Sequence, residues 1–353
     1  MRKGKRLIAW IMAVVMLFTI CVFDGNGTAE AAATTPVAKH GRLSVKGADL
    51  VDSKGNKFQL RGISTHGINW DVGSPYVNKK AFKTLRDDWG VNAIRLAMYT
   101  EEYNGYCSGG SQAKLRKLVD KGVGYATDLG MYAIIDWHIL SDGNPNKNKA
   151  QAKKFFTTMA KKYKNNKNVI YEICNEPNGC SWKEIKSYAT DIIKTIRKYD
   201  KKAVIIVGTP TWSQLGTDGT SNEVADSPIK GYKNIMYSLH FYASEWAHNE
   251  YLPAKVAYAR KKKLPIIVSE FGLSPASGDG AINKASADKW MKLLNKYNIS
   301  YFCWSLSNKN ESASLLKPST KKTSGWKSGD LSTAGKYIKK KYLARKKALG
   351  KKA

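Results

Sequence analysis

The chain has 353 residues, of which 42% are apolar and 11% aromatic, so it is long enough to bury a large core, and no internal repeat or long linker indicates a second domain. Its formal net charge of +31 would suit a nucleic-acid-binding protein. The lysines, however, are spread over most of the helical segments, with a denser run only in "KYIKKKYLARKKALGKK" near the end. We therefore expect no specific binding of nucleic acid.

The first 33 residues have the three parts of a secretory signal peptide. "MRKGKR" is basic, "LIAWIMAVVMLFTICVF" is apolar, and "AEAAA" supplies small residues for cleavage near residues 31 to 33. We expect this segment to be removed, leaving a secreted, extracellular protein with no stable insertion in a membrane. Because the apolar run is long, an uncleaved membrane anchor is the alternative.

Residues 40–60 read as a β-hairpin that turns at Lys54-Gly55-Asn56. Eight short apolar runs rich in β-branched residues come next, and the first of them overlaps the end of this hairpin. They lie too far apart in the sequence to pair as hairpins: 57–64, 91–98, 131–138, 169–175, 203–208, 235–242, 265–272 and 300–307. Between most of them lie amphipathic helical patterns, as in "SWKEIKSYATDIIKTIRKYD", where isoleucines share one stripe and lysines lie opposite.

Strands that alternate with helices, each strand almost continuously apolar, indicate a parallel sheet covered by helices. We predict an α/β fold, a (β/α)8 TIM barrel over residues 34–330 whose bottom is plugged by the N-terminal hairpin, followed by a last helix and basic tail over 331–353. A doubly wound open sheet is the structural alternative.

Four cysteines remain beyond the signal segment. Cys174 and Cys303 lie in apolar strand-like runs, where a free cysteine acts as a small hydrophobe, while Cys107 and Cys180 leave a disulfide possible but not required. The sequence has no CxxC pair and no zinc-type His/Cys spacing. We expect no metal ion and no other cofactor.

Polar and aromatic residues collect at the predicted carboxyl ends of the strands, where the βα loops of a barrel converge and its chemistry is found. In chain order they are His66, Arg95 with Tyr99, His138 in "DWH", Asn175-Glu176, Trp212, His240 with Tyr242, Glu270 and Trp304. Three of the five histidines belong to this set. Packing alone does not explain so many polar residues at one end.

Glu176 and Glu270 end the predicted fourth and seventh strands, so their side chains should face each other across one cleft. Two such carboxylates suit the cleavage of an acetal, one as proton donor and the other as nucleophile or stabiliser. Arg95 and Tyr242 could keep Glu270 ionised, and Asn175 could bind a sugar 2-hydroxyl or hold the geometry. Trp70, Trp212 and Trp304 offer flat faces on which sugar rings stack.

These segments resemble glycoside hydrolase family 5, in particular its bacterial endo-β-1,4-glucanases. The resemblance covers about residues 40 to 316 and is carried by "NAIRLAMY", "DWHIL", "IYEICNEPNG", "LHFYA", "IIVSEFG" and "WSLSNKNES". It implies a retaining barrel hydrolase with Glu176 as acid/base and Glu270 as nucleophile. It further implies supporting roles for Arg95, His138, Asn175, His240, Tyr242 and Trp304, and glycone-binding roles for His66, Trp70, Tyr99, Trp212, Lys309 and Glu311.

We therefore expect a monomeric, metal-independent endo-β-1,4-glucanase that acts on cellulose and related β-glucans. A β-1,4-mannanase or xylanase on the same barrel is the alternative among enzymes, although "SNKNES" favours glucan. A catalytically silent carbohydrate-binding wall protein would need no pair of glutamates. A metal-dependent barrel hydrolase could instead use His66, His138 and His240 as ligands.

Overall fold

The computed structural model describes residues 34–350, so the predicted signal peptide lies outside the described residues. Eight parallel strands close into a barrel in the order β10-β3-β4-β5-β6-β7-β8-β9. They are β3 (Arg61–Thr65), β4 (Ala93–Tyr99), β5 (Tyr132–His138), β6 (Val169–Glu172), β7 (Ile205–Val207), β8 (Ile235–Tyr242), β9 (Ile266–Gly272) and β10 (Tyr301–Leu306). Because β10 pairs with β3, the sheet has no free edge, which confirms the TIM barrel and makes the open sheet wrong.

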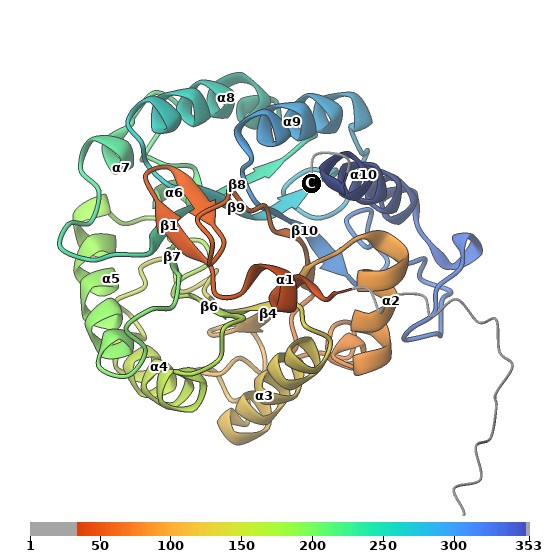
Figure 1. The fold of residues 1–353 in the computed structure, drawn as a ribbon, viewed down its shortest axis with the longest axis horizontal. Helices are drawn as coiled ribbons and strands as arrows, with labels where there is room; N and C mark the ends of the chain where they lie inside the picture. Colours follow the sequence, from red (N-terminus) through yellow and green to blue (C-terminus); the bar gives the residue numbers. More distant parts are fainter. Residues whose placement is uncertain (1–33, 351–353) are drawn as a thin grey trace, which may run out of the picture. The chain divides into compact units, whose positions relative to one another are not determined.

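Helices surround the barrel, as Figure 1 shows. The long ones are α2 (Lys79–Trp89), α3 (Gln112–Asp128), α4 (Lys149–Tyr163), α5 (Trp182–Arg197), α8 (Trp246–Lys261), α9 (Lys284–Tyr297) and α10 (Thr333–Gly350). Short helical turns are α1 (Pro36–His40), α6 (Pro210–Ser213), α7 (Glu223–Asp226), η1 (Ser74–Tyr76) and η2 (Ser328–Asp330). In α5, a capping box between Ser181 and Glu184 begins the helix, and the predicted isoleucine stripe is buried.

The core has two layers, because side chains on a barrel strand alternate between the inside and the helix-facing side. The inner layer includes Tyr132, Ile134, Ile206 and Phe302, all fully buried. The outer layer lies between the strands and the helices and contains the helix tryptophans Trp89, Trp182 and Trp290. This alternation determines which residues of each strand can reach the cleft at its carboxyl end.

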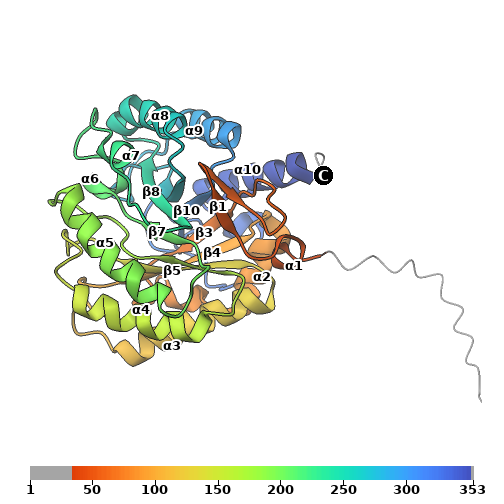
Figure 2. The same cartoon turned by 60° about the vertical axis from the view of Figure 1, so that its left-hand side comes forward.

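The N-terminal hairpin consists of β1 (Ser44–Lys46) and β2 (Asp49–Val51) and turns at Gly47-Ala48. The predicted turn at Lys54-Gly55-Asn56 is wrong for this hairpin; those residues form a second turn, closed by an isolated bridge between Val51 and Lys57. Leu43, Leu50 and Phe58 pack into the inner layer at the amino ends of the strands. The hairpin covers that end of the barrel, as Figures 1 and 2 show.

The last helix, α10, lies over the seam where the barrel closes. Its Tyr342 is fully buried, packs against Tyr301 of β10 and donates a hydrogen bond from its hydroxyl to the carbonyl of Gly62 in β3, at 2.8 Å. α10 also contacts α2. The segment after residue 331 is therefore part of the helical wall and belongs to the same compact unit as the barrel.

The four cysteines of the described residues are free thiols, and Cys174 and Cys303 are fully buried, as predicted for small hydrophobes. Within residues 34–350, no helix has the length and apolar character needed to cross a lipid bilayer.

Candidate active site

A cleft of about 630 Å³ opens at the carboxyl ends of the strands, opposite the hairpin. Of the predicted site residues, it is lined by His66, Trp70, Tyr99, His138, Glu176, Trp212, His240, Tyr242, Glu270, Trp304, Lys309 and Glu311. The other two, Arg95 and Asn175, are fully buried beneath it. The structure thus brings all of the predicted site residues together at one end of the barrel.

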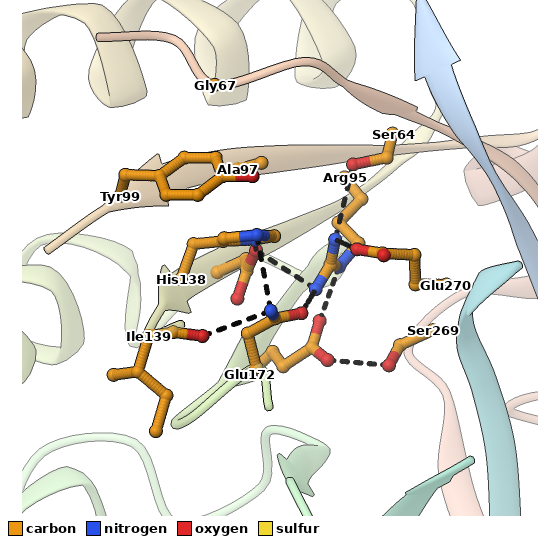
Figure 3. A network of polar contacts seen from close by, with 12 residues as sticks. Ser64, Gly67, Arg95, Ala97, Tyr99, His138, Ile139, Glu172, Ser269 and Glu270 are labelled. Atoms are coloured by element: carbon orange, nitrogen blue, oxygen red, sulfur yellow. Dashed lines mark hydrogen bonds and ion pairs between the residues drawn. The ribbon is translucent and has the colours of Figure 1, made fainter. Parts of the chain in front are cut away.

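Arg95 of β4 is the centre of a buried polar network, drawn in Figure 3. Its guanidinium donates to Glu172 at 2.7 Å and to Glu270 at 3.0 Å, and it lies 3.0 Å from Asp136. Burial alone would lower the pKa of Arg95, but these three carboxylates outweigh it and raise that pKa above its usual value. Arg95 is therefore a permanent cation beneath the cleft.

Glu270 lies on β9 and is held by two donors. The Tyr242 hydroxyl donates to one carboxylate oxygen at 2.7 Å, and Arg95 donates to the other at 3.0 Å. The side chain is 5% exposed and lines the cleft, so it reaches the cleft while most of its surface is covered. These contacts fix its orientation and place a hydroxyl donor and a positive charge against its two oxygens.

A β-bulge in β9 aims Glu270 into the barrel. Ser238 of β8 pairs with Ile267 of β9, and His240 pairs with Glu270, so two steps along β8 correspond to three steps along β9. The pairing of β9 with β10 on its other side contains the same extra residue. Ile267 belongs to the inner layer and Phe271 to the outer layer. The extra residue allows Ser269 and Glu270 to contact the same interior network.

Glu176 lies four residues beyond the end of β6, so the prediction that it ends the strand is wrong; the strand ends at Glu172. Its carboxyl group contacts Nδ1 of His240 at 2.8 Å, and 13% of its side chain is exposed. Burial raises the pKa of Glu176 to about 8; the attraction of Arg95 opposes this rise, and repulsion from Asp136 and Glu172 adds to it. Glu176 therefore carries a proton at neutral pH.

The hydrogen-bond partners of His240 determine which of its ring nitrogens carries the proton. Glu172 accepts from Arg95 through one oxygen and from the Ser269 hydroxyl through the other, at 2.6 Å. With its only proton used, Ser269 accepts from the Ser238 hydroxyl at 2.5 Å and from Nε2 of His240 at 2.9 Å, which leaves Nδ1 as an acceptor for the proton of Glu176. Burial lowers the pKa of His240 to about 4, in agreement with a neutral ring.

His138 and Asn175 form a second buried pair. His138 donates from Nδ1 to Asp136 at 2.6 Å and accepts at Nε2 from Asn175 at 3.2 Å. The remaining amide hydrogen of Asn175 goes to the carbonyl of Ile139, and its oxygen accepts from Arg95. All the polar atoms of the Asn175 side chain thus have protein partners, which favours its geometric role over a direct contact with sugar.

The hydrogen bonds of the histidines test the alternative of a metal-dependent hydrolase, in which His66, His138 and His240 would be the ligands. Both ring nitrogens of His138 are engaged, and Nδ1 of His66 accepts from the backbone N–H of Gly67 at 2.8 Å. In the part of the chain that the structure describes, the one group of His, Cys, Asp and Glu side chains with metal-ligand spacing is Glu176, His240 and Glu270. His66, His138 and His240 do not converge on a common point, so they do not form the proposed metal site.

Aromatic rings line one side of the cleft. His66 and His138 pack against Trp304 of β10, with ring centroids 5.1 and 5.3 Å apart, and Tyr99 packs against Trp70 at 4.6 Å. Trp304 is 6% exposed. These rings offer an apolar wall to the face of a sugar ring.

Trp212 reaches the cleft from the opposite side on a strained turn. Thr211, Trp212 and Ser213 have φ angles of 56°, 51° and 63°, in the left-handed region. The turn is tied to the segment that carries Glu176, because the N–H of Trp212 donates to the carbonyl of Pro177 at 3.0 Å and the Ser213 hydroxyl to that of Asn175 at 2.7 Å. The indole is 44% exposed.

Lys309 and Glu311 follow β10 and form an ion pair at 2.5 Å. The second oxygen of Glu311 is buried, has no hydrogen-bond partner and lies 3.7 Å from Nε2 of His66. Burial raises the pKa of Glu311, opposed by Lys309. This oxygen is a free acceptor at the edge of the cleft, suited to a hydroxyl donor.

Four members of the network are absent from the predicted site residues: Ser64, Asp136, Glu172 and Ser269. Glu172 lies two residues after the inner-layer Ile170, so strand alternation could have placed its side chain inside the barrel. Ser269 has the same relation to Ile267. The cleft also includes Glu102, Gln214, Glu245 and His248, for which the sequence offers no comparable signal.

Paired carboxylates beside an aromatic wall, at the carboxyl end of a TIM barrel, define a glycoside hydrolase site. Residues 51–310 match the family described as Cellulase (glycosyl hydrolase family 5). An endoglucanase from Clostridium saccharobutylicum is 46% identical over 341 residues, which are 95% of this chain and 72% of that protein. Endoglucanase A from Butyrivibrio fibrisolvens is 45% identical over 303 residues, 85% of this chain and 68% of that protein.

A solved structure agrees with these relatives. The catalytic domain of the Thermobifida fusca endoglucanase Cel5A (E5) superposes with a TM-score of 0.81 at 37% identity, covering 88% of this chain and 99% of that chain. A variant of that enzyme has been solved in complex with cellotetraose. The chain belongs to glycosyl hydrolase family 5 and is an endoglucanase of that family.

Proposed function

We propose that this endoglucanase cleaves internal β-1,4-glucosidic bonds with retention of configuration, through a covalent glycosyl-enzyme. The observation that carries this proposal is the distance between the glutamates, since a carboxylate oxygen of Glu176 lies within 4.8 Å of one of Glu270. Retaining enzymes have carboxyl groups about 5 to 5.5 Å apart, whereas inverting enzymes leave about 6.5 to 9.5 Å for a water molecule.

The first step transfers a proton and a glycosyl group. Glu176, protonated at neutral pH, donates its proton to the glycosidic oxygen, while a Glu270 oxygen attacks the anomeric carbon. The bond from that carbon to the glycosidic oxygen breaks, and the new chain end leaves as an alcohol. Arg95 and Tyr242 hold Glu270 in line and compensate its charge before the attack.

The second step restores the enzyme. The Glu176 carboxylate takes a proton from water, whose oxygen attacks the anomeric carbon from the face that the leaving group vacated. The bond to Glu270 breaks, and the sugar is released with its original β configuration. His240 positions Glu176 for the first step, because Nδ1 accepts from the protonated form.

The proposed substrate is β-1,4-glucan, as cellulose chains or as mixed-linkage glucan. Support comes from the cellotetraose complex of the T. fusca relative and from the aromatic wall formed by Trp70, Tyr99 and Trp304. The measurement is reducing-sugar release from carboxymethylcellulose, lichenan, xylan, glucomannan and a pure mannan at equal mass. We expect the first two to give the highest rates; a higher rate on xylan or on a pure mannan would assign the enzyme to the alternative class.

Stereochemistry tests the mechanism directly. Proton NMR of a cellopentaose digest in D2O, recorded before mutarotation, should show the β-anomer of the new reducing end first. Early accumulation of the α-anomer would mean single displacement and would overturn the covalent step while leaving the substrate assignment intact.

We further propose that the protein is secreted and acts as a monomer. The support for secretion is the tripartite pattern of residues 1–33, and the support for a monomer is that this chain by itself supplies both glutamates and the aromatic wall of the cleft. Expression of the full chain in a bacterial host should place activity in the culture supernatant, with an N-terminus near Thr34 and a mass near that of one chain by light scattering. A cell-bound, full-length product would favour the uncleaved anchor.

A further inference from the structure

A groove of about 630 Å³ lies at the amino ends of the strands, at the opposite end of the barrel from the cleft. Three segments enclose it: the chain beside the hairpin, the loop from α4 to β6 and the loop from α5 to β7. Its charged lining residues are Arg42, Lys164, Lys167, Asp200, Lys201 and Lys202. The mechanism above uses none of them.

The single carboxylate of this groove is already engaged. Asp200 is 1% exposed and accepts from the backbone N–H groups of Lys202 and Ala203 at 3.1 and 2.9 Å. It also lies 3.8 Å from the guanidinium of Arg42, which donates to the carbonyl of Lys164. Asp200 therefore balances Arg42 and leaves the lysines of the groove without a counter-charge.

The four lysines, Lys164, Lys167, Lys201 and Lys202, are all exposed. None of them forms an ion pair within 4.0 Å with any residue of the 34–350 range. Four like charges around one concavity repel one another, and an anion placed between them would relieve that repulsion. The groove thus has the shape and the charge of an anion-binding site.

The charge of the molecule is polarised along the barrel axis. The cleft contains Glu102, Glu176, Glu245, Glu270 and Glu311, with Lys309 as its one lysine. Around the groove the lysines continue, with exposed Lys161 at the end of α4, Lys194 and Lys198 at the end of α5, Lys261 at the end of α8 and Lys263 just after it. A long anionic chain that leaves the groove would therefore meet further positive charge.

We propose that this groove binds a linear acidic polysaccharide, one with a carboxylate on many of its sugar units. The groove is too large for a single small anion and lies within the usual volume of a site for several sugar-sized groups. Its free cations are lysines, compact point charges that do not require the planar, paired oxygens that arginine recognises.

Two features argue against nucleic acid as the partner. Single-stranded nucleic acid is usually held by exposed aromatic rings on which the bases stack. The one aromatic residue of the groove, Tyr199, is half-buried, and the ammonium group of Lys161 covers its ring at 5.1 Å. The arginine of the groove lies 3.8 Å from Asp200, whose carboxylate offsets the charge that would attract a phosphate.

The site would hold the enzyme on a charged matrix while the catalytic cleft, at the other end of the barrel, remains open to neutral glucan. Binding and hydrolysis use separate residues, so a substitution in the groove can abolish polysaccharide binding without changing the rate of glucan hydrolysis.

The test compares two quadruple variants of the purified protein that lose the same charge. In the groove variant, Lys164, Lys167, Lys201 and Lys202 are changed to Gln; in the control, the exposed Lys114, Lys117, Lys284 and Lys289 of α3 and α9 are changed to Gln. Calorimetry with polygalacturonate measures binding at several NaCl concentrations. Hydrolysis of neutral mixed-linkage β-glucan is measured in parallel.

We expect the groove variant to bind polygalacturonate at least about tenfold more weakly at 0.1 M salt, with the slope of log K against log salt concentration reduced by about two to three. The control should stay within about threefold of the parent, and both variants should hydrolyse neutral glucan at the parent rate. Equal losses in both variants, or no binding by the parent at 0.05 M salt, would overturn the site. Tighter binding of single-stranded DNA than of polygalacturonate would overturn the choice of partner.

Discussion

Glu176 and Glu270 are the same functional group in opposite surroundings. Glu270 accepts from a tyrosine hydroxyl and a guanidinium, whereas the contact of Glu176 is a neutral histidine. Burial raises the pKa of Glu176 to about 8, and that carboxyl group therefore keeps a proton for the leaving oxygen. Two roles thus follow from two environments at one end of the barrel.

Removing each glutamate should produce a different failure. Glu270→Ala cannot form the glycosyl-enzyme and should lose about 10⁴-fold or more in turnover, with azide in the vacated space giving an α-configured glycosyl azide from an activated aryl β-cellobioside. Glu176→Ala should still form the intermediate from that substrate, and azide should then give the β-configured product. NMR of the isolated azides identifies each configuration. The reverse pairing of variants and products would exchange the two roles.

Ser269 should control the pH profile through His240. Hydrolysis needs protonated Glu176, so kcat/KM of the parent should fall as pH rises through about 8. In Ser269→Ala, Nε2 of His240 loses its acceptor, the ring can carry its proton on Nδ1, and that proton would stabilise ionised Glu176. The pKa of Glu176 then falls, and the alkaline limb should move down by about one pH unit.

The control for this prediction is Ser274→Ala. Ser274 is also buried but donates to the carbonyl of Pro275, outside the network. Its alkaline limb should match that of the parent, and the rate of Ser269→Ala at pH 5 should remain close to the parent rate. An unshifted limb in Ser269→Ala would show that the serine does not fix the tautomer.

The residues that sequence analysis found and missed differ in a physical way. Glu176 and Glu270 lie in recognisable sequence motifs. The alternation of side chains along β6 would have placed Glu172 inside the barrel as well. Alternation could not have placed Ser269 and Glu270 in the same network, because a bulge that adds one residue depends on the pairing of three strands. The left-handed turn at Trp212 is equally a product of tertiary contacts, with Pro177 and Asn175 as partners.

At the scale of elements, local pattern predicted all eight barrel strands within a few residues, because each is a continuous apolar run between amphipathic helices. The hairpin turn was wrong because two turns lie close together in residues 40–60. Gly47 and Gly55 both have positive φ angles, of 60° and 83°, so both positions are suited to a turn. The choice between them depends on which residues plug the barrel.

The plug should contribute to stability and not to catalysis. Leu50 is 3% exposed and packs into the inner layer at the end opposite the cleft. Leu50→Ala should cost about 2 to 5 kcal/mol of the free energy of unfolding and lower the melting temperature by about 5 °C or more. kcat/KM at 25 °C should stay within about twofold of the parent.

Leu343→Ala on α10 is the matched control, because this leucine is 37% exposed and its truncation leaves no cavity. Its melting temperature should change little. If Leu50→Ala lowered kcat/KM by tenfold while folded, the hairpin would be coupled to the active site through the barrel interior.

At the scale of the whole molecule, two opposing fields act on a charged substrate. The chain has a formal net charge of +31, which attracts a polyanion from a distance, whereas the cleft is lined by glutamates, which repel it on contact. Salt separates the two effects, since the screening length falls from about 30 Å at 0.01 M to about 8 Å at 0.15 M. Long-range attraction should therefore dominate only at low salt.

The prediction concerns the KM for two soluble cellulose derivatives, anionic carboxymethylcellulose and neutral hydroxyethylcellulose. Raising NaCl from 0.01 to 0.3 M should increase the KM for the anionic polymer about threefold or more, because the attraction of the whole molecule is screened while contact repulsion in the cleft persists. The KM for the neutral polymer and both kcat values should change by less than about 1.5-fold, since no net charge on the substrate is involved. A KM for carboxymethylcellulose that falls with salt would mean that the acidic cleft, and not the basic surface, governs the encounter.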